Sequence, residues 1–162
     1  GHLLRAAAQV VARRSDVHFL IMGYPSTEMY RYQAQQMGLE AFTTFTGRIN
    51  YADAPRYLAL GDVAVAPKLS ATEGIGKLLN YMAMSLPTVV YDTEVSREYL
   101  GEWGLYARPA DIDDLARSLL CILDDPARAE RIGAALRQRA RECYSWDIAA
   151  QRILDVYASA LG

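Results

Sequence analysis

The sequence predicts an α/β fold: a doubly wound, mostly parallel, Rossmann-like sheet covered by helices, with further helices at its C-terminal end. Short and almost continuously apolar runs, such as residues 17–22 and 87–91, are typical of parallel strands buried on both faces. These runs alternate with segments whose apolar residues recur at helical spacing. The 162 residues fit one domain, 1–162, and no apolar run approaches the ~20 residues that span a bilayer.

The first half of the chain predicts three helices and three strands in alternation. In order, these are a helix over 3–11, a strand over 17–22, a helix over 27–37, a strand over 42–46, a short helix over 53–60 and a strand over 63–66. Ser26 and Asp53 precede helices and are expected to cap them, because their side-chain oxygens can accept from the first free N–H groups. Gly38 is expected to end the second helix.

The second half predicts a helix that begins near Gly76, two more strands and a helical C-terminal region. In order, these are a strand over 87–91, a helical turn over 96–100, a strand over 105–107 and helices over 111–123, 126–142 and from 145 onward. Asp111 and Ser145 are expected to cap the helices that follow them. The pair Asp111-Ile112-Asp113 also mimics a D-x-D metal motif, but its position at a helix start favours a structural role, and no metal is expected.

The loop before residue 76 predicts an anion site. The strand stops at Pro67, two glycines follow at 74 and 76, and a helix then begins with Lys77 in its first turn. The first N–H groups of a helix have no intrahelical partner, and Lys77 adds a full positive charge there. Lys68 and Lys77 are the only lysines of the chain. Phosphate is therefore the expected ligand of this loop.

Three predicted loops follow the carboxyl ends of strands, where α/β sheets bind their ligands. They begin at Gly23-Tyr24, at Gly47-Arg48 and after Ala66. We therefore expect them to lie along one rim of the sheet.

Composition excludes several functions. A net charge of −2 and a pI of about 5.7 give no global attraction to nucleic acid. Cys121 and Cys143 lack metal-ligand spacing, and His2 and His18 are isolated, so neither a zinc site nor a disulfide framework is expected. The thiols are expected to lie in a reducing compartment.

Several motifs, in this order, resemble the carboxy-terminal, donor-binding domain of GT-B glycosyltransferases of the large retaining family four, also described as glycosyl transferases group 1. The matching stretches are Phe19-Leu20-Ile21-Met22-Gly23, Phe45-Thr46-Gly47-Arg48-Ile49, Tyr57-Leu58-Ala59-Leu60-Gly61-Asp62-Val63, Glu73-Gly74-Ile75-Gly76, Met82-Ala83, Leu86-Pro87-Thr88-Val89-Val90, Leu123-Asp124-Asp125-Pro126 and Tyr144-Ser145-Trp146. Each motif alone is weak, but their order and spacing are specific.

The resemblance implies a binding site for a nucleoside diphosphate sugar and no cofactor beyond that donor. Glu73 would hydrogen-bond the donor sugar, and the turn Gly74-Ile75-Gly76 with Lys77 would hold the diphosphate, with Lys68 nearby. Gly23, Tyr24 and Arg48 would border the nucleobase.

The family's second glutamate, which binds the ribose, falls here on Asn80, after an interval one residue shorter than usual. An amide oxygen can still accept from a ribose hydroxyl, but without a charge-assisted bond.

The resemblance also implies that the chain is about half of an enzyme. The family's first strand would precede residue 1, and an amino-terminal domain that binds the acceptor would lie upstream. The intact enzyme is expected to be a cytoplasmic hexosyltransferase without a transmembrane segment, and association with a membrane surface through the missing domain is compatible with this. The isolated domain is expected to be inactive. In the family the last helix crosses onto the other domain, so part of the apolar face around Trp146, Ile153 and Tyr157 is expected to be uncovered; packing onto its own sheet is the alternative.

Two other functions are compatible with parts of the pattern. A non-catalytic binding or regulatory module with the same sheet is the main alternative, and Asn80 favours it. A dehydrogenase half would need G-x-G-x-x-G after the first strand, which Gly23-Tyr24-Pro25-Ser26 does not provide.

Overall fold

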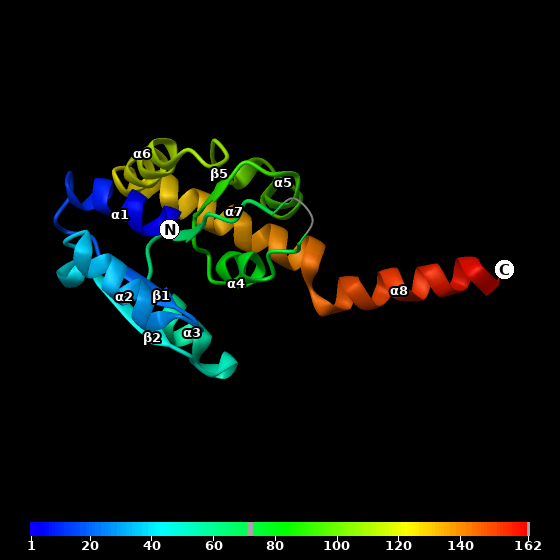
Figure 1. Cartoon of the computed structure of the whole chain (residues 1–162). Helices are drawn as coiled ribbons and strands as arrows, with labels where there is room; N and C mark the ends of the chain where they lie inside the picture. The colour runs from blue at the N-terminus through cyan, green and yellow to red at the C-terminus, as the bar shows by residue number, and fades with distance from the viewer. Residues whose placement is uncertain (71–72, 162) are drawn as a thin grey trace.

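The computed structural model describes residues 1–70 and 73–161, so Ala71 and Thr72 of the predicted anion loop lie outside the described residues. Helices and strands alternate as the sequence predicts (Figure 1). The elements are α1 (His2–Val11), β1 (Phe19–Met22), α2 (Thr27–Gln36), β2 (Thr43–Gly47), α3 (Ala54–Leu58), β3 (Ala64–Ala66), α4 (Lys77–Ala83), β4 (Thr88–Tyr91), α5 (Glu94–Leu100), β5 (Leu105–Ala107), α6 (Ile112–Leu123), α7 (Pro126–Tyr144) and α8 (Trp146–Leu161). Short 3-10 turns η1 (Glu40–Phe42), η2 (Tyr51–Asp53) and η3 (Gly101–Trp103) connect some of them.

The strands form two parallel sheets. β1 pairs with β2 in one sheet, and the other has the order β3-β4-β5. The parallel α/β class is thus confirmed, but within the described residues no ladder joins β1 to β3. Helix α2 packs against the smaller sheet, and α4 to α7 surround the larger one (Figure 1). Leu58 of α3 packs with Ala64 of β3 and with Leu86, and Met22 of β1 packs against them.

Each sheet has its own hydrophobic core, and α1 serves both. Leu4 and Ala7 of α1 pack beside β1 and β2 with Ala34 and Leu39. The larger core lies around β3, β4 and β5, and α1 joins it through Ala6 and Val10. Because these four α1 residues are almost fully buried, α1 holds the two sheets in a fixed relation.

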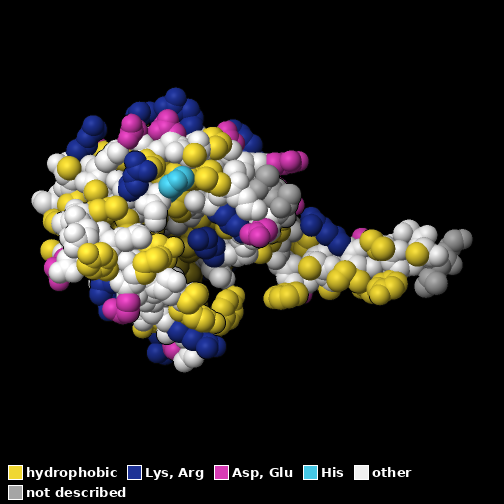
Figure 2. Space-filling view, in the orientation of Figure 1, with side chains coloured by type: hydrophobic (Ala, Val, Ile, Leu, Met, Phe, Trp, Pro, Cys, Tyr) yellow, Lys and Arg dark blue, Asp and Glu magenta, His cyan; other side chains and the backbone are white. Residues whose placement is uncertain are grey.

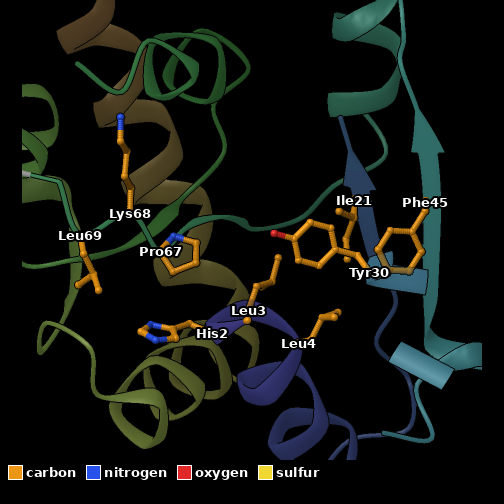
Figure 3. A pocket seen from close by; sticks show the side chains of 10 residues that line it. His2, Leu3, Leu4, Ile21, Tyr30, Phe45, Pro67, Lys68 and Leu69 are labelled. Carbon is orange, nitrogen blue, oxygen red and sulfur yellow. The ribbon is translucent and has the colours of Figure 1, made fainter. Parts of the chain in front are cut away.

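A cavity of about 510 Å³ lies between the two sheets. The side chains of Ile21, Tyr30 and Phe45 line one wall, Pro67 and Lys68 the opposite wall, and the first residues of α1 the floor (Figure 3). The cavity therefore lies between β1 and the loop that follows β3.

Helix N-caps agree with the sequence in the second half and differ in the first, while Gly38 follows the end of α2 with φ 69°, as predicted. Asp111 accepts from the Asp114 N–H at 2.8 Å, and the Ser145 hydroxyl accepts from the Ile148 N–H at 3.3 Å, as predicted. Ser26 makes no capping bond because its backbone is left-handed, with φ 71°; instead the Thr27 hydroxyl donates to the Gly23 carbonyl. Asp53 also makes no capping bond, since it ends the turn η2 with a helical backbone of its own.

Helix α8 extends away from the body, and hydrophobic side chains lie along it in Figure 2. Trp146 is 90% exposed, and Ile153, Leu154, Val156 and Tyr157 are also exposed. The prediction that part of this apolar face is uncovered is therefore confirmed, and the alternative, in which the face packs onto the chain's own sheet, is wrong. Among the described helices, none combines the length and apolar character needed to cross a membrane.

Candidate functional site

Two glycines end the strands of the smaller sheet at the same level. Gly23 has φ 141° and Gly47 has φ 67°, backbone angles that favour glycine. The Gly23 N–H donates to the Gly47 carbonyl at 3.1 Å, so the two loops leave the sheet side by side. The predicted convergence of these two loops is confirmed.

Tyr24 and Arg48, which follow these glycines, stack on each other. The Arg48 guanidinium carbon lies 5.0 Å from the centre of the Tyr24 ring, within the range of a cation–π contact. Tyr24 is 60% exposed, so the ring still has free surface. An exposed aromatic ring held by a guanidinium is suited to contact a planar group such as a nucleobase.

The loop after β3 brings Lys68 and Glu73 together. The Lys68 Nζ and the Glu73 Oε2 are 2.7 Å apart, and the Glu73 N–H donates to the Ser70 hydroxyl at 3.2 Å. The ion pair lowers the pKa of Glu73 below its usual value, mainly through the hydrogen bond from Lys68. Glu73 is therefore a carboxylate at neutral pH. Sequence reasoning placed both residues in the site but missed their pairing, because the intervening loop carries no periodic pattern.

Lys77 lies at the start of α4, as predicted, and its environment disfavours the charged form of the ammonium group. Its side chain is exposed, yet nearby protein partly desolvates the ammonium group, and this desolvation together with the positive charge of Lys68 lowers its pKa. Two like charges that act on each other favour a bound anion. Because the Glu73 carboxylate lies against Lys68, the group formed by Lys68, Lys77 and Glu73 carries a net charge of +1.

The glycine-rich turn has separate roles along its length. The Ile75 side chain is buried in the large core and 3% exposed, so only its backbone is available to a ligand. A Cβ on Gly74 would lie 3.4 Å from the Tyr99 hydroxyl, whereas one on Gly76 would meet nothing within 4 Å. Ile75 thus anchors the turn, and Gly74 and Gly76 expose its backbone.

Asn80 has a partner that the sequence did not indicate. The Tyr51 hydroxyl donates to the Asn80 Oδ1 at 3.1 Å, joining the loop after β2 to α4. Tyr51 is 79% exposed and lies four residues after Gly47 in sequence. An exposed aromatic residue shortly after a rim loop was the available signal, and only the fold shows that it reaches Asn80.

His2 is a second residue that sequence reasoning set aside. Its Nδ1 and the hydroxyl of the buried Tyr91 are 2.9 Å apart, with the two rings edge to face. His2 lines the cavity together with Lys68 (Figure 3). The start of α1 thus borders the same cavity as the loop after β3.

The site as a whole offers lysines, exposed backbone and a carboxylate on loops at the ends of strands. In residues 1–70 and 73–161, no three His, Cys, Asp or Glu side chains are grouped as a metal centre requires. The arrangement can hold a polyanion at the lysines and accept hydroxyl hydrogen bonds at Glu73 and Asn80.

Comparison with protein families gives a match over most of the chain. The family described as "Glycosyl transferases group 1" matches residues 1–125. A GDP-mannose-dependent monoacylated alpha-(1-6)-phosphatidylinositol monomannoside mannosyltransferase of Corynebacterium glutamicum is 28% identical, over 97% of this chain and 43% of its own length. The phosphatidyl-myo-inositol mannosyltransferase of Mycolicibacterium smegmatis is 31% identical, over 99% of this chain and 41% of its own length. The chain therefore spans about two fifths of the length of these curated relatives.

Solved structures with the same fold are GT-B glycosyltransferases. The sucrose-phosphate synthase of Thermosynechococcus elongatus superposes with a TM-score of 0.84 at 23% identity, over 98% of this chain and 42% of that one. Anabaena HepE in complex with UDP-glucose gives a TM-score of 0.85 at 18% identity, over 98% of this chain and 44% of that one. At this level of identity the likeness concerns the fold.

Proposed function

Since this chain belongs to the glycosyl transferases group 1 family, we propose that it is the donor-binding domain of a retaining glycosyltransferase and binds a nucleoside diphosphate sugar. The observation that carries the proposal is the placement of the two lysines of the chain. Lys68 lies where the loop after β3 lines the cavity, and Lys77 begins α4 at the other end of the same glycine-containing loop. In keeping with this placement, the charge of Lys68 contributes to lowering the pKa of Lys77. A diphosphate between them relieves that repulsion.

The other candidate residues are each assigned to one part of the donor. Tyr24 and Arg48 border the nucleobase with Gly23, and Asn80 accepts from the ribose. Gly74, Ile75 and Gly76 offer backbone to the diphosphate. Glu73 is the carboxylate that orients the sugar. The related proteins support a nucleotide-sugar donor, since the Corynebacterium glutamicum mannosyltransferase is GDP-mannose-dependent and Anabaena HepE was solved with UDP-glucose.

The proposed reaction is transfer of the sugar to an acceptor hydroxyl with retention at the anomeric carbon. The leaving nucleoside diphosphate gains negative charge as the bond to the sugar breaks. Lys68 and Lys77 offset that charge, which lowers the barrier electrostatically. The acceptor is bound by a part of the protein outside this chain, and we propose that the isolated domain transfers no sugar.

Thermal shift of the full-length protein tests the donor proposal. GDP-mannose, UDP-glucose and ADP-glucose are added separately, and a ligand at 100 times its Kd adds about 2.7 kcal/mol of stability. We expect one of them to raise the melting temperature and Lys77→Ala to remove the shift. Arg13→Ala is the matched control, because this exposed cation follows the C-terminal end of α1, whereas the N-terminal end of α1 lines the cavity. Absence of a shift with all three donors contradicts the proposal, and donor binding without transfer would favour the non-catalytic module.

We also propose that a strand preceding α1 in the longer protein fills the cavity between β1 and β3. Strand spacing and rise imply an envelope of about 160 Å³ per residue, so the cavity of about 510 Å³ holds roughly three strand residues. Its neighbours β1 and β3 have four and three residues. Amide exchange tests the idea. A longer chain that includes this segment should protect amides of β1 and β3 that exchange freely in residues 1–162, and equal exchange in both chains contradicts it.

A further inference from the structure

The ion pair of Lys68 and Glu73 joins two residues that the proposed function assigns to different parts of the donor. Their charged atoms are 2.7 Å apart, and the Lys68 side chain is 30% exposed while that of Glu73 is 72% exposed. The backbone of Glu73 is held to the Ser70 hydroxyl. Without a donor, therefore, the sugar-binding carboxylate is attached to a lysine of the diphosphate site.

A diphosphate and the Glu73 carboxylate cannot both use Lys68 without cost. An ammonium group has three donors, but two anions on one ammonium lie within a few ångströms of each other and repel. The diphosphate carries the greater charge and also has Lys77 to contact. It is therefore the stronger partner for Lys68.

We propose that the donor diphosphate displaces Glu73 from Lys68, and that the carboxylate released in this way then accepts hydrogen bonds from the donor sugar. This inference rests on the proposed function and adds a coupling between its two subsites. Diphosphate binding makes the sugar-binding group available, so that the two halves of the donor are recognised in sequence.

The exchange also determines specificity between the donor and its spent product. An intact donor offers Glu73 new hydroxyl partners in place of Lys68. A nucleoside diphosphate without sugar breaks the same ion pair and leaves the carboxylate with water alone. The pair thus lowers the affinity for the product relative to the donor, which favours release after transfer.

Binding measurements on Glu73→Gln in the full-length protein test the exchange. Titration calorimetry with GDP, UDP, GDP-mannose and UDP-glucose at about 50 mM salt limits screening of the pair. Exposed ion pairs contribute 0.2–1 kcal/mol, so removing this one should tighten binding of the bare nucleoside diphosphate by about 1.5- to 5-fold. The same variant should lose the preference for the sugar-bearing form.

Two further variants complete the test. Asp124→Asn is the matched control, because it removes a carboxylate from another exposed 2.7 Å ion pair, with Arg14, and it should leave both affinities unchanged. In a Lys68→Ala background, Glu73→Gln should no longer tighten binding. Unchanged or weaker diphosphate binding by Glu73→Gln overturns the exchange alone, whereas wild-type protein that binds none of the four nucleotides overturns the proposed function as well.

Discussion

Substitution of Gly133 by alanine is predicted to destabilise the protein, although alanine is the better helix former. Gly133 is buried in α7 where that helix packs against the segment after α4. A Cβ there would lie 2.0 Å from the carbonyl oxygen of Ser85 and 2.9 Å from its carbonyl carbon. Because both atoms belong to the backbone, no side-chain rotation relieves the contact.

The magnitude follows from two opposing terms. Alanine gains about 1 kcal/mol over glycine in a helix interior. Overpacking costs typically about 1–3 kcal/mol and occasionally more, and a 2.0 Å approach to backbone belongs at the upper end. Ser85 cannot move freely, since its φ is 58° and its N–H bonds the Met82 carbonyl at 3.0 Å. We expect a net loss of about 1–2 kcal/mol, which in a chain of this size lowers the melting temperature by about 2–8 °C.

Urea unfolding followed by circular dichroism measures the difference, with Gly76→Ala as control. A Cβ on Gly76 meets nothing within 4 Å and its φ is −51°, so that variant should be neutral or slightly more stable. Gly133→Ala should also weaken donor binding, because a displaced Ser85 moves the helix that carries Lys77. A Gly133→Ala protein as stable as the wild type would refute the steric argument.

Three shorter predictions concern the site and the pH dependence of stability. Asn80→Glu restores a charge-assisted bond to the ribose and should tighten nucleotide binding by about 2- to 10-fold, by calorimetry, while inorganic pyrophosphate gains nothing; equal gains for both ligands would contradict a ribose role. Arg48→Ala removes the support of Tyr24 and should weaken nucleotide binding by roughly 2- to 5-fold with pyrophosphate unaffected; a parallel loss for pyrophosphate would place Arg48 at the phosphates. The pKa of Asp114 is lowered, chiefly by the hydrogen bond from the Arg108 N–H at 2.8 Å, so its contribution to stability is complete above the unfolded pKa and is lost as pH falls through the folded pKa. Asp114→Asn should therefore flatten the acid side of the stability curve, and an unchanged acid limb would show that this bond does not persist in solution.

Local pattern was sufficient for the order of elements. The apolar run at 87–91 became β4 because every residue of that strand is buried, which is what such a run requires. Asp111 and Ser145 cap their helices because an N-cap depends only on a side-chain oxygen and N–H groups two or three residues away. The prediction that Ser26 caps α2 was wrong for a related reason, since its backbone is left-handed and its hydroxyl makes no bond to the α2 N–H groups.

The sequence by itself determined the fold class and the two rim loops at Gly23 and Gly47, because strand and helix periods and turn residues act over short distances along the chain. Tertiary structure alone decided which side chains meet. The bond between Tyr51 and Asn80 and the pairing of His2 with Tyr91 join elements far apart in the sequence that the packed cores bring together. The ion pair between Lys68 and Glu73 depends on the path of the loop after β3, which no periodic pattern specifies. The division into two sheets with a cavity between them was also decided by the tertiary structure. Strand pairing is a contact between segments that the local pattern does not specify.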